Sequence, residues 1–284
     1  MQRKNVIPKV SVIIPTYNRA YFLPEVIESV LSQTYPSFEL LVVDDGSTDT
    51  TSLVVQKYKQ VQYIYQLQSG VSAARNNGIL RAQGDFLTFL DSDDLWNKEK
   101  LKYQVEFFAT NPSSYICYTD EIWLKSGKRI NQGKKHKKFS GDIFEKTLKL
   151  CIISPSSVMM KRELFRYVGY FDEELLVCED YDLWIRVASK FPIHFIDKPL
   201  IVKRGGHEDQ LSRKFWGMDR FRIYALEKIL RENLTKEQKE KVLLELKDKI
   251  DIICKGAWKR KKYGRWLRFR MKAHRVSCSS VFLS

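Results

Sequence analysis

Long hydrophobic runs are missing from this sequence. A helix needs roughly 18 consecutive apolar residues to cross a bilayer, and no stretch of the 284 residues approaches that length. The apolar run after Lys9 covers only residues 10–14 before Pro15 interrupts it, which is too short for the apolar part of a signal peptide. We therefore expect a globular chain that stays in the cytoplasm.

Cysteine is sparse, and its spacing argues against two kinds of stabilising site. The five cysteines are scattered along the chain, and no two of them form a C-x-x-C motif. An odd number of scattered cysteines indicates neither a disulfide framework nor a zinc site. We expect them to be reduced thiols that mostly serve packing.

Acidic residues are absent from two segments, and this absence locates the excess positive charge. The formal net charge is +15, yet residues 122–141 carry seven Lys or Arg, residues 255–275 carry ten, and neither segment has an acid. The rest of the chain sums to −2. The main body is therefore not basic, and the two basic segments need their own explanations.

What the sequence does contain is an alternation of apolar, strand-like clusters with helical patterns. The strand-like clusters cover residues 10–14, 38–43, 61–65, 85–90 and 115–119. This order predicts an α/β fold in which helices cover both faces of a mostly parallel sheet. In such a sheet, a ligand is expected beyond the carboxyl ends of the strands.

Polar residues follow three of these strands. Residues 15–18 (PTYN) follow the first, Asp44 and Asp45 the second, and residues 91–94 (DSDD) the fourth. Each group alone could be an ordinary turn or helix cap. Together, five carboxylates in one cleft would repel one another unless a cation or hydrogen-bond donors compensate them. A divalent metal with a bound diphosphate would meet that need, because Mg²⁺ or Mn²⁺ shares its shell between carboxylates and phosphate oxygens.

Five ordered motifs resemble those of the family 2 glycosyltransferases, which have the nucleotide-sugar-binding GT-A fold. The motifs are PTYN (15–18), VVDDGSTD (42–49), GVSAARNNGI (70–79), FLDSDD (89–94) and CEDYDLWIR (178–186). The resemblance covers roughly residues 9–212. It implies a GT-A domain over residues 1–212, with a nucleotide-sugar half at about 9–120 and an acceptor and base half at about 121–212. Residues 213–284 would form a helical, basic C-terminal extension.

The resemblance also implies a donor site. It would bind the nucleotide sugar through three groups of side chains: Pro15, Thr16, Tyr17 and Asn18 in the nucleotide pocket, Asp44 and Asp45 at base and ribose, and Arg75, Asp91 and Ser92. Of the last group, Arg75 would reach the base or phosphate end and Asp91 the ribose or a metal-bound water. It would place Mn²⁺ or Mg²⁺ on Asp91, Asp93 and His207. From the residues alone, Arg75 could equally be an ion-paired surface side chain, and His207 an ordinary surface histidine.

The catalytic residues implied by the resemblance lie at the start of a later helix. Asp180 would be the general base, with Glu179 beside it to orient or tune it. Helix-dipole complementarity is the alternative explanation for acids in a first helical turn. Asp94 is expected either to cap the helix that starts near Asn97 or to support the site. The implied reaction is inverting transfer of a hexosyl or hexosaminyl group, most simply from a UDP-sugar, to a hydroxyl of a glycan or lipid-linked acceptor.

Two other classes of protein fit the sequence less well. A sugar-phosphate nucleotidyltransferase would carry a Gly-rich, basic phosphate loop after the first strand, where PTYN stands instead. A non-catalytic glycan- or nucleic-acid-binding protein would not need to keep a metal site and a base together. The sequence therefore predicts an enzyme of cell-surface polysaccharide or glycolipid synthesis.

The two basic segments leave more alternatives open. The pattern of residues 123–138 predicts a polar hairpin or loop, which is either solvated or in contact with an anionic acceptor. Residues 255–275 interleave aromatic side chains with basic ones, which suits an anionic membrane surface, RNA or packing on the body. For a glycosyltransferase we expect peripheral contact with the inner face of the membrane, and nucleic acid is not an expected partner.

Overall fold

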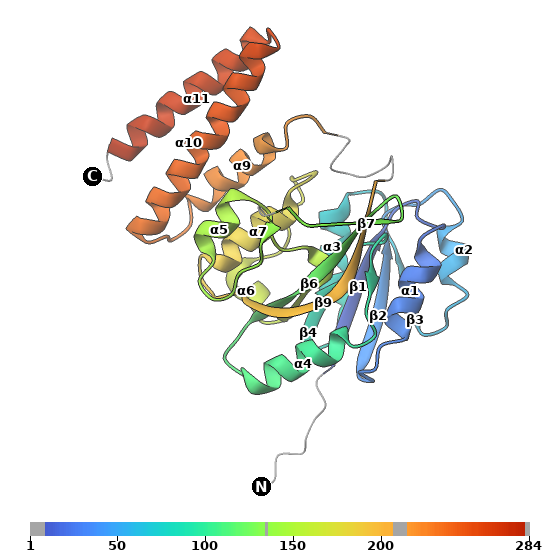
Figure 1. Cartoon of the computed structure of the whole chain (residues 1–284). Coiled ribbons are helices and arrows are strands. Elements are labelled where there is room, and N and C mark those ends of the chain that lie inside the picture. Colours follow the sequence, from blue (N-terminus) through green and yellow to red (C-terminus); the bar gives the residue numbers. More distant parts are fainter. Residues whose placement is uncertain (1–8, 134–135, 207–214, 282–284) are drawn as a thin grey trace.

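A nine-stranded mixed sheet forms the centre of the computed structural model, which describes residues 9–133, 136–206 and 215–281 (Figure 1). Its strands are β1 (Val10–Thr16), β2 (Phe38–Asp44), β3 (Val61–Tyr65), β4 (Phe86–Phe89), β5 (Leu95–Trp96), β6 (Ile116–Lys125), β7 (Lys128–Ile130), β8 (Val158–Lys161) and β9 (His194–Gly205). The path through the sheet runs β3-β2-β1-β4-β8-β6-β9-β5, and β7 pairs with β6.

Helices surround this sheet and extend from it. They are α1 (Leu23–Leu31), α2 (Thr51–Val55), α3 (Val71–Arg81), α4 (Lys100–Thr110), α5 (Phe144–Lys149), the short 3₁₀ helix η2 (Pro155–Ser157), α6 (Leu164–Val168), α7 (Glu179–Ala188), α9 (Asp219–Ile229), α10 (Lys236–Lys259) and α11 (Tyr263–Val281). The α/β fold expected from the alternating pattern is confirmed.

The first half of the sheet is parallel, as predicted. β2 and β4 flank β1 in parallel, and β3 extends the sheet beside β2. In this register Ile13 lies beside both Leu41 and Phe89, and Thr16 lies beside Asp44. The carboxyl ends of these strands therefore meet at one edge of the sheet, which brings together the polar loops that follow them.

The second half of the sheet departs from the parallel pattern. β8 is antiparallel to both of its neighbours, β4 and β6, whereas β6 runs parallel to β9. The β6–β9 register shifts at Asp120, between Thr119 and Glu121. Such a bulge re-aims the side chains beside it, and this one lies next to the cavities described below.

Apolar side chains are buried on both faces of the sheet, because alternate residues of a strand point to opposite sides. Val12 and Ile14 join the cluster beneath α1 and α4, while Ile13 joins the cluster that contains α7 and α9. All three side chains are fully buried. The near-continuous apolar strands of the sequence thus reflect a sheet covered on both sides.

The chain ends in a helical hairpin that projects from the body (Figure 1). α10 begins with a capping box, in which the side chains of Thr235 and Gln238 each accept a hydrogen bond from the other residue's backbone N–H. Its inner part is buried through Val242, Leu246 and Ile250. α10 continues to Lys259, so the basic segment starts inside this helix and continues into α11. No helix in the described part of the chain is both long and apolar enough to cross a bilayer.

Candidate active site

A cavity of about 330 Å³ lies where the loop after β4 faces the starts of α3 and α7 and the end of β9. The predicted site residues that line it are Pro15, Arg75, Asp91, Ser92, Asp93, Glu179 and Asp180. These residues come from both halves of the chain, up to 165 positions apart in sequence. The fold therefore brings the DSDD segment and the acidic start of α7 into one cavity.

Arg75 joins the two acidic groups of this cavity. Its Nη2 donates to Asp91 Oδ1 at 2.7 Å and its Nη1 donates to Glu179 Oε1 at 2.6 Å. The residue is only 3% exposed, and its guanidinium lies over the ring of Phe171. Burial alone would lower the pKa of Arg75, but Asp91 and Glu179 raise it overall. Arg75 is thus a buried, permanently charged bridge, and the alternative of a surface ion pair is excluded for this structure.

The ionisation of Glu179 is strongly altered by its position in the cavity. Burial raises its pKa, the nearby Arg75 opposes this, and the charge of Asp180 raises it further, to about 7. The two neighbouring acids at the start of α7 therefore differ in environment, because Asp180 is less buried. Such a pairing of carboxylates is typical of catalytic sites.

Asp180 faces the cavity with one oxygen held by a thiol. Cys151 Sγ donates to its Oδ2 at 3.1 Å, and its Oδ1 accepts from the N–H of Tyr181 at 2.7 Å. Burial and the charge of Asp180 raise the pKa of the Cys151 thiol, so it keeps its proton. Asp182, the third acid of this turn, instead points into the core, where Arg186 and Lys228 pair with it.

Asp94 supports the loop that carries Asp91 and Asp93. Its Oδ2 accepts from Ser156 Oγ at 2.7 Å, and its Oδ1 accepts from the N–H of Arg204 at 3.1 Å. Burial, followed by the charges of Asp93 and Asp91, raises its pKa well above the ordinary value. The capping role is wrong, because α4 begins at Lys100 and its first turn receives no side-chain cap. The supporting role fits.

The predicted metal site stays a prediction. Asp91 and Asp93 line the cavity, and carboxylate oxygens are the ligands that Mg²⁺ and Mn²⁺ prefer. Within residues 9–133, 136–206 and 215–281, no group of three or more His, Cys, Asp or Glu side chains is arranged to hold a metal ion. His207 lies outside the described residues.

Asp44 and Asp45 serve the loops beside the cavity and do not line it. Asp45 accepts three hydrogen bonds of 2.8 Å, from the Gln66 side chain and from the N–H groups of Ser69 and Gly70. Asp44 accepts from the N–H of Ser47 and from the Tyr63 hydroxyl. Both carboxylates therefore fix the chain between β2 and α3, and their predicted contact with base and ribose stays a prediction.

The PTYN segment is divided between the cavity wall and a loop contact. Pro15 lines the cavity, whereas Thr16, Tyr17 and Asn18 lie beside it. Asn18 has a left-handed backbone, with φ of 50°, and its Oδ1 accepts from the N–H of Thr48 at 2.8 Å. Asn tolerates this conformation better than most residues. Its place in the motif is thus explained by the turn that ties the first loop to the second.

Four cations of the cavity were not predicted from the sequence, and one of them is Arg19 in the loop after β1. Lys203 and Arg204 are carried by β9, and Arg222 by α9. Burial alone would lower the pKa of Lys203, but Glu121, Asp94 and Asp91 raise it overall. Arg204 Nη2 and Arg222 Nε are buried without a hydrogen-bond partner. The sequence signal for two of these cations is the adjacent pair Lys203 and Arg204 before Gly205. This pair lies outside the two basic segments, 122–141 and 255–275.

Residues 11–169 match the family described as Glycosyl transferase family 2. The chain belongs to this family. Its sequence is 41% identical over 195 residues to an uncharacterized glycosyltransferase of Rickettsia felis, a match that covers 68% of this chain. That match covers 32% of the Rickettsia protein, so the chain spans about a third of the length of this relative. The predicted family is therefore confirmed.

A second relative and a solved structure extend the comparison. The chain is 33% identical over 198 residues to the Escherichia coli UDP-Glc:alpha-D-GlcNAc-diphosphoundecaprenol beta-1,3-glucosyltransferase WfgD, covering 69% of this chain and 76% of that one. It also resembles S. aureus TarS 1-349 in complex with UDP-GlcNAc, with a TM-score of 0.76 and 23% identity over 92% of this chain and 79% of that one. The structural likeness confirms the GT-A fold.

Proposed function

We propose that this glycosyltransferase moves a sugar with inversion from a UDP-sugar to a hydroxyl of a glycan or lipid-linked acceptor, in the synthesis of a cell-surface polysaccharide or glycolipid. The observation that carries the proposal is the Arg75 bridge. It holds Asp91 of the DSDD segment and Glu179, the neighbour of Asp180, at the wall of one cavity. The family relative WfgD supports the choice of donor and acceptor, because its name specifies UDP-glucose and a lipid diphosphate acceptor.

The chemistry follows from the groups in the cavity. The acceptor hydroxyl would attack the anomeric carbon on the face opposite the diphosphate, and Asp180 would take the hydroxyl proton. A bond from the anomeric carbon to the acceptor oxygen forms as the bond to the phosphate oxygen breaks, and the nucleoside diphosphate leaves. Arg204 and Arg222 each have an unpartnered guanidinium nitrogen, which suits the charge that develops on the leaving group.

The donor set of the cavity fits a divalent cation. Asp91 and Asp93 would hold Mn²⁺ or Mg²⁺, with His207 as a third ligand. When bound, such a cation neutralises charge on a departing diphosphate. Burial, followed by the charges of Asp93 and Asp91, raises the pKa of Asp94. Carboxylates this close together beside a diphosphate would be stabilised by a shared cation.

The test of this function is a donor screen read by release of nucleoside diphosphate. Purified protein would be offered UDP-, GDP- and dTDP-sugars, each with Mn²⁺, with Mg²⁺ and with EDTA. We expect a UDP-sugar to be cleaved fastest, and cleavage to be lost in EDTA. Release of a nucleoside diphosphate from none of these donors, under any metal condition, would remove the proposal. Release of pyrophosphate from a nucleotide and a sugar phosphate would instead identify a nucleotidyltransferase.

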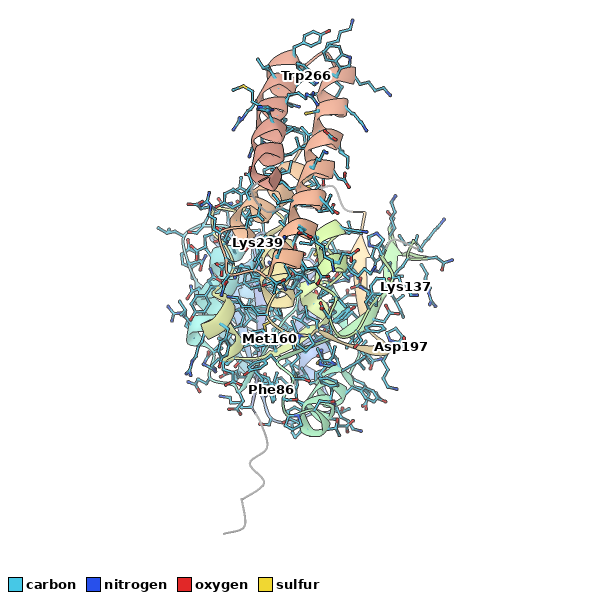
Figure 2. All side chains as sticks on the ribbon, turned by 90° about the vertical axis from the view of Figure 1, so that its left-hand side faces the viewer. Phe86, Lys137, Met160, Asp197, Lys239 and Trp266 are labelled. Carbon is cyan, nitrogen blue, oxygen red and sulfur yellow. The ribbon has the colours of Figure 1, made fainter. Side chains whose placement is uncertain are left out.

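The helical hairpin is proposed to contact an anionic membrane surface from the cytoplasmic side. Trp258 lies against the rings of Tyr263 and Trp266 at the turn between α10 and α11, and Trp266 is seen at the tip in Figure 2. Trp258 and Tyr263 are more than half exposed. The adjoining Lys and Arg side chains would meet anionic headgroups while the aromatic rings enter the interface.

A further inference from the structure

A second, smaller cavity lies directly behind Asp180. It has a volume of about 120 Å³, and it shares Cys151, Asp180 and Lys203 with the main cavity. That volume is room for about four water molecules. We refer to it as the inner cavity. Asp180 is thus a wall common to both spaces, so a group in the inner cavity would approach the base from the side away from Arg75 and Asp91.

The inner cavity also opens outward. It shares Glu121, Trp123, His136 and Lys138 with a groove of about 800 Å³ that runs over the β6–β7 hairpin. Lys137 and Asp197 line this groove, and Figure 2 shows both on one side of the body, well away from the hairpin tip at Trp266. A chain-like molecule could therefore enter along the groove and place its end beside Asp180.

Glu121 is a buried carboxylate in which one oxygen accepts hydrogen bonds and the other has no hydrogen-bond partner. Its Oε1 accepts from Trp123 Nε1 at 2.9 Å and from Lys138 Nζ at 3.0 Å. Its Oε2 is buried without a hydrogen-bond partner. Burial alone would raise the pKa of Glu121, but Lys203 and Lys138 lower it below its ordinary value. The carboxylate is therefore ionised and fixed in orientation, and its second oxygen can accept a hydrogen bond from a ligand.

Ser154 adds a second buried polar group without a partner, and Lys203 adds a cation beside it. Ser154 Oγ is buried, has no hydrogen-bond partner, and belongs to a residue that lines the inner cavity. Among the described residues, the ammonium of Lys203 has no carboxylate within ion-pair distance, although four acids act on it from farther away. Buried polar groups are normally paired. The two buried oxygens without a partner, Glu121 Oε2 and Ser154 Oγ, together with the Lys203 ammonium beside the same cavity, indicate a polar ligand.

We propose that the inner cavity is the subsite for the acceptor's sugar ring, held by Glu121, Ser154 and Lys203 with its attacking hydroxyl at Asp180. A sugar ring fits this donor and acceptor set because each hydroxyl both donates and accepts. One hydroxyl would donate to Glu121 Oε2, a second would accept from Lys203, and Ser154 could do either. This assignment rests on the proposed glycosyl transfer, and it names a glycoside as the class of acceptor.

The test compares Ser154→Ala and Glu121→Gln with the wild type. Octyl glycosides of common hexoses and N-acetylhexosamines would be the acceptors, with UDP-glucose, UDP-galactose or UDP-N-acetylglucosamine as donor. We expect the acceptor KM to rise about threefold to tenfold in Ser154→Ala and about tenfold to hundredfold in Glu121→Gln, as for loss of a neutral and a charged hydrogen bond. The affinity for UDP should stay within about twofold.

Two controls separate a binding role from a structural one. Ser154→Ala removes a hydroxyl that has no partner in the protein, so its melting temperature should match the wild type. Glu240→Gln makes the same change as Glu121→Gln at an exposed site on α10, and its acceptor KM should not move.

Three outcomes have distinct meanings. An unchanged acceptor KM in both variants, in a wild type that transfers sugar, would overturn the subsite. So would a wild type that cleaves a UDP-sugar but uses none of the glycosides as acceptor. A wild type that cleaves no nucleotide sugar at all would instead remove the proposed function itself.

Discussion

Asp180 and Asp182 show how two acids in one helical turn can have unrelated roles. Asp180 faces the cavity, whereas Asp182 is fully buried and paired with Arg186 and Lys228. The sequence predicted an acidic first turn but could not separate them. The separation depends on which face of α7 meets the cavity, and that is decided by packing. Asp182 is therefore not an alternative base.

Asp180→Asn tests the base directly. The amide keeps the shape of the carboxylate but cannot take a proton, so kcat should fall by about 10²-fold or more while donor affinity survives. Steady-state kinetics together with UDP binding would measure both quantities. Asp248→Asn, an exposed change on α10, is the matched control. Near-normal turnover in Asp180→Asn would show that another group takes the proton.

Asp93→Ala tests the cation site. Removal of one of the two carboxylates should abolish transfer and weaken UDP binding in Mn²⁺, with little effect in EDTA, because the cation would link nucleotide to protein. Calorimetric titration of UDP in both buffers would measure this difference. If wild-type protein binds UDP equally well in Mn²⁺ and in EDTA, the predicted metal dependence is wrong.

Glu179 should leave a signature in the pH dependence of stability. Its pKa is raised from 4.5 to about 7, so between these values the folded state keeps a proton that the unfolded chain has lost. The free energy of unfolding must therefore fall as the pH rises through this window. Glu179→Gln cannot titrate, so relative to this variant the wild type should lose up to about 3 kcal/mol between about pH 5 and about pH 8. Urea unfolding at several pH values would measure the loss, and parallel profiles would contradict it.

At the scale of elements, α3 approaches the sheet so closely that one position permits no side chain. A Cβ at Gly78 would lie 2.5 Å from Ile13 Cγ2 and 3.3 Å from Val43 Cγ2. The same helix carries Arg75. The glycine therefore sets the depth at which the bridging arginine enters the cavity.

Gly78→Ala should both destabilise the protein and disturb the site. The added methyl must push α3 away from β1, at a cost of about 1–3 kcal/mol, and turnover should fall with it because Arg75 moves too. Urea unfolding and donor cleavage would measure the two effects. Gly264→Ala is the control, since no atom lies within 4 Å of the added carbon in α11, and it should be neutral or slightly stabilising. Equal stability of the two variants would contradict the close approach.

The elements that the sequence predicts well are those with a strong local pattern. The parallel strands β1 to β4 appear as apolar runs, and the capping-box spacing of Thr235 and Gln238 indicates the start of α10. The antiparallel direction of β8 had no such signal, because strand direction is decided by long-range packing. The inner cavity was missed for a similar reason. Glu121, Ser154 and Lys203 come from separate elements and belong to no shared motif.

At the scale of the whole molecule, the helical hairpin of α10 and α11 carries the basic segment 255–275 away from the catalytic body (Figure 1). The aromatic cluster of Trp258, Tyr263 and Trp266 lies at its turn, and α11 packs back along α10. Trp266 and Phe269 also pack against the core. Deletion of residues 255–284 would therefore remove structural contacts. Variants that neutralise charge give a cleaner test of membrane binding.

Neutralising four cations at the turn should release the protein from anionic vesicles. Replacing Lys261, Lys262, Arg265 and Arg268 with Gln should weaken binding to phosphatidylglycerol vesicles by up to several hundredfold, since each cation contributes about 1 kcal/mol near such a surface. Vesicle co-sedimentation would measure the change. Wild-type binding should also weaken as salt is raised, and cleavage of the donor should be unaffected.

A control variant removes the same charge elsewhere. Replacing the exposed Lys57, Lys59, Lys98 and Lys102 with Gln changes the net charge equally but leaves the hairpin intact. It should bind vesicles like the wild type. If both variants lose binding to the same degree, the membrane contact is a general charge effect and the hairpin has no special part in it.

The Arg75 bridge makes the two sides of the cavity thermodynamically interdependent. One guanidinium is shared between Asp91 and Glu179, so a cation that neutralises Asp91 leaves more of the arginine's charge to Glu179 and lowers the pKa of that carboxyl. Linkage is reciprocal. Cation binding would therefore release a proton from Glu179, and a rise in pH through the titration of Glu179 would tighten cation binding by the same free energy. Binding of the cation with the donor would thus ionise Glu179, the neighbour of the base Asp180, before the acceptor binds.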